Sequence, residues 1–178
     1  MKKQLRNKYI SLRNDLNEDK KNNLDNLIFS NLIENPFYKK AKSIFTFVSM
    51  PSEIDTHKLI KKALDDQKIV LVPKIIDKSI MIATRIYDYD QLYKDKFGIY
   101  SVKNTEEFKK PDLTICPGLC FDIFKNRLGY GGGYYDNYIR SHKSRYIGIF
   151  YSFQKENKVI VDENDQKLDF ILTEKEFF

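Results

Sequence analysis

Apolar side chains recur every three or four positions over the first 34 residues, as at Leu5, Tyr9 and Leu12. This spacing places them on one face of an α-helix. It predicts helices over residues 2–14 and 18–34, the second of which carries the same pattern. Each helix therefore has one face that must be covered by another part of the chain.

The helix ends are predicted from residues with special backbone preferences. Asn17 precedes two acidic residues, an arrangement typical of a helix N-cap and first turn. Pro36 is expected to close the second helix, because proline has no N–H and clashes with the preceding turn. A further helix is expected to start from a cap at Asp55 or Thr56 and to run to about Asp66.

Short apolar runs rich in β-branched and aromatic residues separate the helices and are typical of buried strands. They predict strands at residues 43–48, 69–72, 80–87, 113–116, 146–150 and 170–173. Pro73 is expected to end the second strand, and Pro117 with Gly118 the fourth. A helix from about Gly132 to Arg140 is expected before the fifth.

This alternation of helices and strands predicts an α/β fold: a single-domain, open, mostly parallel sheet with helices on both faces, a Rossmann-like three-layer arrangement. The length of 178 residues suits one domain over residues 1–178. Ligands of such sheets bind at the carboxyl ends of the strands. We therefore expect residues 49–55, Pro73 with Lys74, and a glycine-rich segment at 127–136 to converge on one edge.

The composition, 42% hydrophobic and 31% charged, is that of a globular protein and not of a disordered chain. No run of 18 apolar residues is present, and no apolar segment follows the first residues, so we expect neither a membrane span nor a signal peptide. Cys116 and Cys120 are too few for a disulfide scaffold and are interpreted as buried thiols. The expected location is the cytoplasm, and the expected state a monomer.

A net charge of +6, from 31 Lys and Arg against 25 Asp and Glu, suits an anionic ligand. It is also compatible with nucleic-acid binding. The basic residues are spread along the chain and interleaved with acids, so we expect neither a nucleic-acid nor a membrane partner.

The segment from Arg127 to Asp136 contains four of the seven glycines within five positions. Glycines allow positive φ and let a ligand approach the backbone, and N–H groups at a helix start bind anions. A cation before the glycines and a carboxylate after them are typical of a loop that holds nucleotide phosphates and their metal. A glycine-rich turn with packed tyrosines is the alternative.

Other candidates are ambiguous on their own. Glu53 follows the first strand and is equally suited to bind the polar edge of a purine- or pterin-like ring or to begin a helix. Lys2 and Arg6 share a helix face, which usually means exposure to solvent. The acidic cluster at 162–165 is typical of a solvated turn. Neither histidine, His57 nor His142, has a partner at the spacing of a catalytic triad.

Taken together, residues 117–122 and 127–136 resemble the signature of the 5-formyltetrahydrofolate cyclo-ligase family. The resemblance extends over nearly the whole chain. It includes an N-terminal ATP-contacting helix, a folate-binding segment, a mobile Phe-Gly-Ile loop and an acidic tail motif, matched by residues 2–6, 49–56, 97–100 and 164–169.

The resemblance implies an ATP- and Mg²⁺-dependent reaction, with ATP as co-substrate. ATP phosphorylates the formyl oxygen of 5-formyltetrahydrofolate or its polyglutamates, N10 attacks the activated carbon, and ADP, phosphate and 5,10-methenyltetrahydrofolate result. No protein nucleophile is needed, because catalysis rests on positioning and charge neutralisation.

It also implies the residue roles. ATP would be bound by Lys2, Lys3, Gln4, Leu5, Arg6, Arg127, Leu128, Gly129, Tyr130, Gly131, Gly132, Gly133, Tyr134 and Tyr135. Folate would be bound by Val48, Glu53, Tyr130, Gly131, Gly132, Gly133 and Tyr134, and magnesium by Asp136 and Asp165.

The chain departs from the family pattern at two places. Tyr130 and Gly132 stand where some relatives carry basic residues, so phosphate binding is expected to rely on backbone N–H groups, Arg127 and either Lys74 or Lys125. Residues 100–102 replace a Glu-Pro of many relatives, which leaves the substrate role of this loop open.

Two other functions remain open from the sequence. A sugar-phosphate or acyl-CoA enzyme on a similar sheet would also use a glycine loop, but would not depend on ATP. An RNA-binding protein would show steep salt dependence and no ATP hydrolysis.

Overall fold

The computed structural model describes residues 1–96 and 98–178, so Phe97 of the expected mobile loop lies outside the described residues. The α-helices of the described chain are α1 (Lys2–Asn14), α2 (Glu18–Glu34), α3 (Pro36–Lys40), α4 (His57–Asp65) and α5 (Tyr134–Ser141). Two short 3₁₀ helices are η1 (Tyr89–Gln91) and η2 (Ser152–Gln154).

The central sheet has six strands in the order β10-β9-β6-β1-β2-β3. Its strands are β1 (Ser43–Thr46), β2 (Ile69–Asp77), β3 (Ile80–Ile86), β6 (Leu113–Cys116), β9 (Arg145–Ile149) and β10 (Phe170–Leu172). Neighbours are parallel except β2 and β3, which form an antiparallel hairpin at one edge. Two small ribbons pair β4 (Tyr93–Lys94) with β5 (Tyr100–Ser101) and β7 (Cys120–Phe121) with β8 (Arg127–Leu128). The predicted mostly parallel sheet is confirmed.

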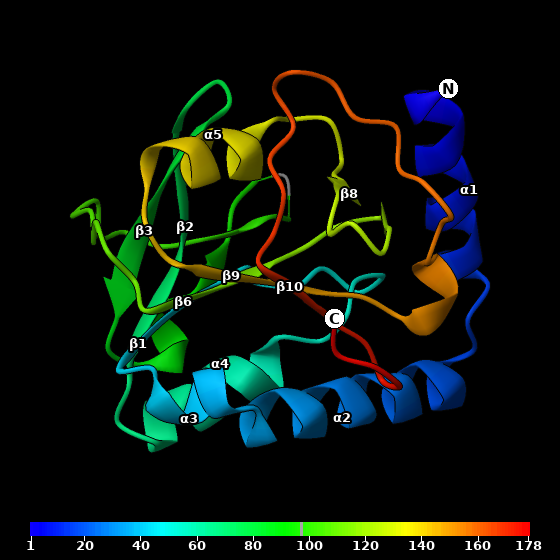
Figure 1. The fold of residues 1–178 in the computed structure, drawn as a ribbon. Helices are drawn as coiled ribbons and strands as arrows, with labels where there is room; N and C mark the ends of the chain where they lie inside the picture. Colours follow the sequence, from blue (N-terminus) through cyan, green and yellow to red (C-terminus); the bar gives the residue numbers. More distant parts are fainter. Residues whose placement is uncertain (97) are drawn as a thin grey trace.

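Helices cover both faces of the sheet, as predicted. Figure 1 shows α2, α3 and α4 together on one side and α5 on the other, with α1 standing at one end beside the C-terminal third of the chain. Successive residues of β1 alternate between the layers: Ile44 joins the core beneath α2 and α4, and Phe45 the core beneath α5. This alternation is the two-residue period of a strand buried on both faces.

The two proline predictions were wrong in part. Helix α2 does end at Glu34, but Pro36 begins the short helix α3, where the Asn35 side chain accepts a hydrogen bond from the Phe37 N–H. The fixed φ of proline suits a first helical position. Strand β2 continues through Pro73, which pairs only with β3. On its other side β2 pairs with β1 only as far as Leu71. Pro73 therefore has no β1 partner to which a backbone N–H would have to donate.

The remaining helix signals were more accurate. The Asn17 side chain caps α2 by accepting from Lys20 N at 2.8 Å. Before α4, the Asp55 carboxylate accepts from His57 N at 2.9 Å. The Thr56 hydroxyl instead donates to the Phe47 carbonyl at 2.7 Å, closing the loop between β1 and α4.

None of the helices in the described part of the chain is both long and apolar enough to cross a bilayer.

Candidate active site

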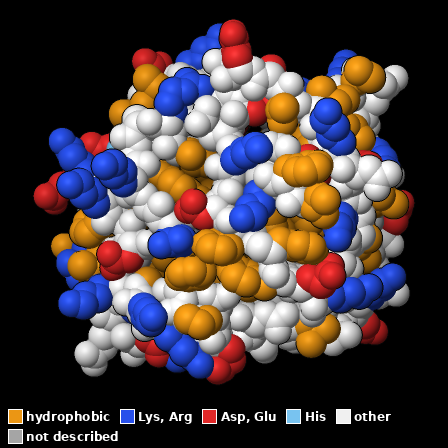
Figure 2. Space-filling view, viewed as in Figure 1, with side chains coloured by type: hydrophobic (Ala, Val, Ile, Leu, Met, Phe, Trp, Pro, Cys, Tyr) orange, Lys and Arg blue, Asp and Glu red, His pale blue; other side chains and the backbone are white. Residues whose placement is uncertain are grey.

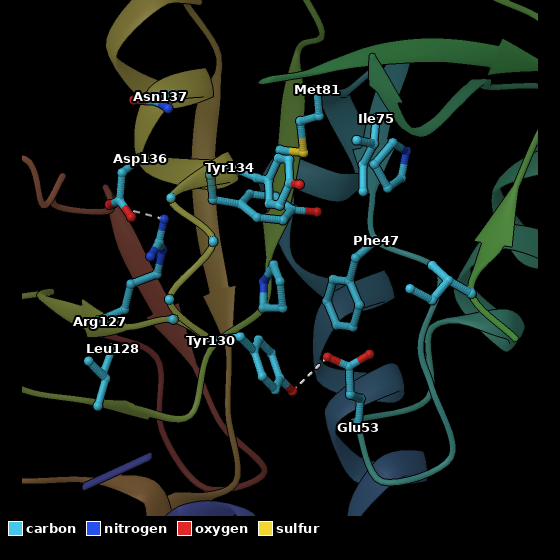
Figure 3. Close-up of a pocket in the computed structure, with 18 of the residues that line it drawn as sticks. Phe47, Glu53, Ile75, Met81, Arg127, Leu128, Tyr130, Tyr134, Asp136 and Asn137 are labelled. Carbon is cyan, nitrogen blue, oxygen red and sulfur yellow. Dashed lines mark hydrogen bonds and ion pairs between the residues drawn. The ribbon is translucent and has the colours of Figure 1, made fainter. Parts of the chain in front are cut away.

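A cavity of about 820 Å³ opens at the carboxyl ends of β1, β2 and β6, within the size range of small-molecule sites. It is lined by Glu53 from the loop after β1, by Pro73 of β2, by Pro117 after β6, and by the glycine loop. The predicted convergence on one edge of the sheet is therefore confirmed for the segment after β1, for Pro73 and for the glycine loop, but not for the Lys74 side chain. Figure 3 shows Arg127 with Asp136 on one side of the cavity and Tyr130 with Glu53 on another.

The glycine loop starts from a rigid ribbon. Asp122, fully buried in the turn between β7 and β8, accepts hydrogen bonds from the N–H groups of Phe124, Asn126 and Val159. A buried carboxylate with this many donors is fully satisfied inside the protein. Asp122 therefore has a structural role, and it anchors the strand from which Arg127 enters the cavity.

The loop needs glycine at two positions for its backbone shape. Gly131 has φ +104° and Gly133 has φ +71°, a region that other residues adopt only with strain. Gly133 is also the residue before the first turn of α5, so the helix starts at the cavity wall. The exposed backbone of Gly131 and Gly132 faces the same cavity. This is the arrangement of an anion-binding helix start.

Arg127 is nearly completely buried, with 2% of its side chain exposed. Its Nη2 lies 3.3 Å from Asp136 Oδ1, an ion-pair distance. Neither Nε nor Nη2 makes a hydrogen bond within the described residues. Buried donors without acceptors are costly unless a ligand supplies the acceptor. Arg127 is therefore oriented for an anion in the cavity.

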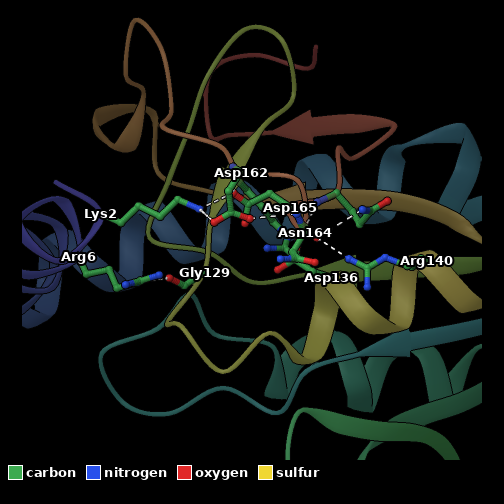
Figure 4. A network of polar contacts seen from close by, with 10 residues as sticks. Lys2, Arg6, Gly129, Asp136, Arg140, Asp162, Asn164 and Asp165 are labelled. Carbon is green, nitrogen blue, oxygen red and sulfur yellow. Dashed lines mark hydrogen bonds and ion pairs between the residues drawn. The ribbon is translucent and has the colours of Figure 1, made fainter.

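Helix α1 brings two more cations to the same region (Figure 4). Lys2 Nζ contacts Asp162 at 2.7 Å and Asp165 at 2.5 Å. Partial burial lowers the pKa of Lys2, but these two carboxylates outweigh it and raise the pKa above its usual range. Arg6 Nε donates to the Gly129 carbonyl at 2.9 Å, and its guanidinium packs against Gly131, where a Cβ would lie 3.3 Å away.

The two predicted metal ligands each lie beside a cation. Asp136 is near Arg127 and also accepts from Gln166 N at 2.9 Å. Asp165 is paired with Lys2. Among the described residues no group of three or more His, Cys, Asp or Glu side chains is placed to hold a metal ion. Magnesium carried by a nucleotide takes only one or two carboxylates, so this donor set fits such an ion.

The opposite wall is built around Glu53. Its Oε2 accepts from Met50 N at 2.9 Å, and its Oε1 accepts from the Tyr130 hydroxyl at 2.7 Å. The guanidinium of Arg13, from α1, lies 5.5 Å from the centre of the Tyr130 ring. Glu53 is thus held as a hydrogen-bond acceptor beside the apolar side chain of Phe47.

Most of the predicted site residues line this one cavity. They are Lys2, Arg6, Val48, Glu53, Asp136, Asp165 and all residues from Arg127 to Tyr135. Lys3 and Gln4 are exposed outside it, and Leu5 packs against a small core cluster under α1, so their assignment to ATP stays a prediction.

The two lysines suggested for phosphate binding point elsewhere. Lys74 Nζ donates to the Val102 carbonyl at 2.6 Å, and Lys125 Nζ lies 5.3 Å from the Phe170 ring centre. Neither lines the cavity. Lys74 instead ties β2 to the segment after β5.

Sequence reasoning missed the apolar and amide side chains of the cavity. Phe47, Ile75, Met81 and Asn137 all line it. Phe47 had a usable signal, because it lies near the carboxyl end of the first predicted strand. Ile75 had none, since the second strand was expected to end at Pro73. Met81 lies in the third predicted strand, and nothing in the sequence indicated that it faces a cavity.

The thiols match the sequence interpretation. Cys116 and Cys120 are free and buried. Burial raises the pKa of each thiol to about 12, so neither is a reactive thiolate at neutral pH.

Comparison with known proteins identifies the family of the chain. A sequence model of the 5-formyltetrahydrofolate cyclo-ligase family matches residues 1–174. A probable 5-formyltetrahydrofolate cyclo-ligase of Schizosaccharomyces pombe is 30% identical over 172 residues, covering 82% of this chain and 81% of the relative. The mouse 5-formyltetrahydrofolate cyclo-ligase is 29% identical over 164 residues, covering 83% and 81%.

Solved structures show the same likeness. The 5,10-methenyltetrahydrofolate synthetase of Aquifex aeolicus superposes with a TM-score of 0.88 at 30% identity, over 99% of this chain and 91% of that one. The Mycoplasma pneumoniae enzyme of the same name gives a TM-score of 0.76 at 25% identity, over 97% and 98%.

Proposed function

Because the chain belongs to the 5-formyltetrahydrofolate cyclo-ligase family, we propose that it converts 5-formyltetrahydrofolate into 5,10-methenyltetrahydrofolate with ATP and Mg²⁺, releasing ADP and phosphate. One observation carries the proposal. A single cavity has unsatisfied buried guanidinium donors on one side, at Arg127, and a fixed carboxylate on the other, at Glu53. These suit a phosphate donor and a ring with polar N–H groups, held side by side.

The nucleotide end is formed by the glycine loop and α1. Arg127, Lys2 and Arg6 surround the exposed backbone of the loop, so three cations meet the phosphates of ATP. Tyr134 and Tyr135 supply aromatic surface at the start of α5. In this arrangement the helix start, the guanidinium fork and the lysine all favour negative charge.

The metal end is formed by Asp136 and Asp165. A magnesium ion bound there with ATP would neutralise charge on the phosphates. Lys2 and Arg127 hold these carboxylates in the free protein. With ATP bound, phosphate oxygens would be partners for Lys2 and Arg127, and Asp136 and Asp165 would be the carboxylates available to hold the metal.

The folate end is formed by Glu53, Val48 and the tyrosine of the glycine loop, Tyr130. The Glu53 carboxylate is an acceptor matched to the N–H groups along the polar edge of a pterin. The apolar wall beside it, with Phe47 and Met81, suits the faces of the rings. This end is lined by side chains from the segment after β1, from β3 and from Tyr130, and the phosphate end by the rest of the glycine loop.

The reaction needs positioning and charge neutralisation from the protein, but no nucleophile. The formyl oxygen forms a bond to the γ-phosphorus as the bond to the ADP oxygen breaks. N10 then attacks the formyl carbon and loses its proton, and the carbon–oxygen bond breaks to release phosphate. Within the described residues the cavity contains no histidine or cysteine, which is consistent with this chemistry.

We further propose that residues 1–178 act as one domain, as a monomer in the cytoplasm, on small molecules including folate polyglutamates. The proposal includes no nucleic-acid or membrane partner. On the face drawn in Figure 2, Lys and Arg alternate with Asp and Glu instead of forming one basic patch.

A direct assay tests this function. Purified protein is mixed with 5-formyltetrahydrofolate, Mg²⁺ and ATP, and the near-ultraviolet absorbance of the methenyl product is followed. We expect a rise that requires both ATP and Mg²⁺. No rise with folded protein would contradict the proposal, and thermal-shift screening of nucleotides and anionic metabolites would then identify the ligand.

A further inference from the structure

The hydroxyl of Tyr135 is a buried polar group without a partner. It lies in the first turn of α5, and its oxygen makes no hydrogen bond within the described residues. The ring stacks against Phe45 with centres 6.2 Å apart and planes 16° apart. It packs against both core clusters, one on each face of the sheet, which places it over the strand ends.

This side chain also lies between the two ends of the cavity. Tyr135 lines the cavity, and the Arg127 guanidinium is 5.9 Å from its ring centre. Glu53 and Arg127 line the same cavity on different sides (Figure 3). Under the proposed function Glu53 marks the folate and Arg127 the phosphates, so the hydroxyl is near the path of the transferred group.

The hydroxyl is a phenol, which carries its proton at neutral pH. A neutral phenol is able to donate one hydrogen bond. An unpartnered buried hydroxyl destabilises the folded state. Unsatisfied groups of this kind are typical of sites that a ligand completes.

We propose that the Tyr135 hydroxyl is a catalytic group that donates a hydrogen bond to the phosphoryl group as this passes from ATP to the formyl oxygen. The inference rests on the proposed function. During the transfer the bond from γ-phosphorus to the ADP oxygen breaks with its electron pair going to ADP, and the bond from phosphorus to the formyl oxygen forms. Tyr135 stays protonated throughout and neither gains nor loses a bond to the substrate.

The same hydrogen bond assists the second half of the reaction. When N10 has attacked the carbon, the carbon–oxygen bond breaks and phosphate leaves with the electron pair. A donor at the phosphate oxygens stabilises this developing charge. Because the charge distribution changes in the transition states, the hydroxyl should affect kcat more than the binding of either substrate.

The chain offers a matched control in the same helix. The Tyr138 hydroxyl is also buried without a partner, but Tyr138 does not line the cavity. Tyr135→Phe and Tyr138→Phe therefore make the same chemical change at two buried sites. Each removes an unsatisfied group, so neither variant should unfold at a lower temperature than the wild type.

The test measures kcat and both KM values for the wild type and the two variants, with thermal unfolding alongside. For Tyr135→Phe we expect kcat to fall about 10- to 100-fold, the range for loss of one transition-state donor, with each KM within about twofold. Tyr138→Phe should keep kcat within about twofold of the wild type.

Each other result overturns the inference. A kcat of Tyr135→Phe within about twofold of the wild type would show that the hydroxyl has no catalytic role. An equal loss in Tyr138→Phe, or a raised KM at unchanged kcat, would assign the effect to packing or to binding. A markedly lower unfolding temperature for Tyr135→Phe would show that the hydroxyl has a partner inside the protein. If the wild type itself makes no methenyl product, the proposed function fails first.

Discussion

The Tyr130 hydroxyl donates a hydrogen bond to Glu53 at 2.7 Å, joining residues 77 positions apart in the chain. Tyr130 belongs to the glycine loop and Glu53 to the loop after β1. The contact therefore joins the glycine loop to the loop after β1 at the proposed folate end of the cavity. It also fixes the carboxylate that we assign to the pterin.

Glu53→Gln should weaken folate binding selectively. The glutamine amide has one acceptor oxygen where the carboxylate has two. It therefore cannot accept hydrogen bonds from both Met50 N and the N–H groups of the ligand as Glu53 does. We expect the Kd for 5-formyltetrahydrofolate, measured calorimetrically, to rise at least about tenfold, or about 1.4 kcal/mol. The Kd for a non-hydrolysable ATP analogue should stay unchanged. The exposed Glu34→Gln is the control, and equal weakening of both ligands would argue against the assignment.

Turnover should require the guanidinium of Arg127, and a lysine at this position should not restore it. Arg127→Ala is expected to lower ATP-dependent turnover by more than about tenfold, which is at least about 1.4 kcal/mol. Arg127→Lys keeps the charge but not the planar fork, so most of the loss should remain. Steady-state kinetics check this, with the surface change Arg145→Ala for comparison. Near wild-type rates in both Arg127 variants would exclude the loop as the phosphate site.

Lys2→Met should weaken nucleotide binding without unfolding α1. The ammonium is the cation that the helix brings to the acidic tail and the cavity. We expect KM for ATP to rise about fivefold or more, equivalent to about 1 kcal/mol. Lys8→Met is a matched control, because Lys8 is on the same helix but pairs with Glu156 outside the cavity. The prediction is wrong if the two variants behave alike.

Gly131→Ala should disturb the phosphate loop. A Cβ at φ +104° is strained, and it would lie 3.3 Å from the Arg6 guanidinium. Left-handed backbone costs a residue with a Cβ about 1–2 kcal/mol. We expect a loss of this size in urea unfolding together with a raised KM for ATP. Gly98→Ala has a similar φ of +76° but open space around it, so it should change stability and leave that KM alone.

Docking of α1 should weaken in acid. Hydrogen bonds from Lys8 and then Tyr9 hold the pKa of Glu156 below its usual 4.5. A lowered folded-state pKa gives stability above the unfolded pKa, and that stability is lost as pH falls through the folded pKa. Glu156→Gln should therefore unfold about 1 kcal/mol more easily at pH 7, and the difference should shrink below pH about 4.5. A difference independent of pH would contradict this origin.

The sequence by itself determined the main helices, the strands of the central sheet and the family. Helices α1 and α2 were predicted at their observed bounds, because the three-to-four-residue period of apolar side chains is local. The glycine loop was recognisable because positive φ and close backbone approach limit the residue choice. The direction of β2 beyond Pro73 was not predictable, since it depends on which neighbours the strand has.

Only the tertiary structure decided which candidates act together. Lys2 and Glu53 are ambiguous in the sequence, and folding places both in one cavity. Lys74 and Lys125 were equally plausible as phosphate ligands, but their side chains reach Val102 and Phe170 instead. The reason is physical: a residue type defines which bonds a group can make, whereas packing defines which partner lies within about 3 Å of it.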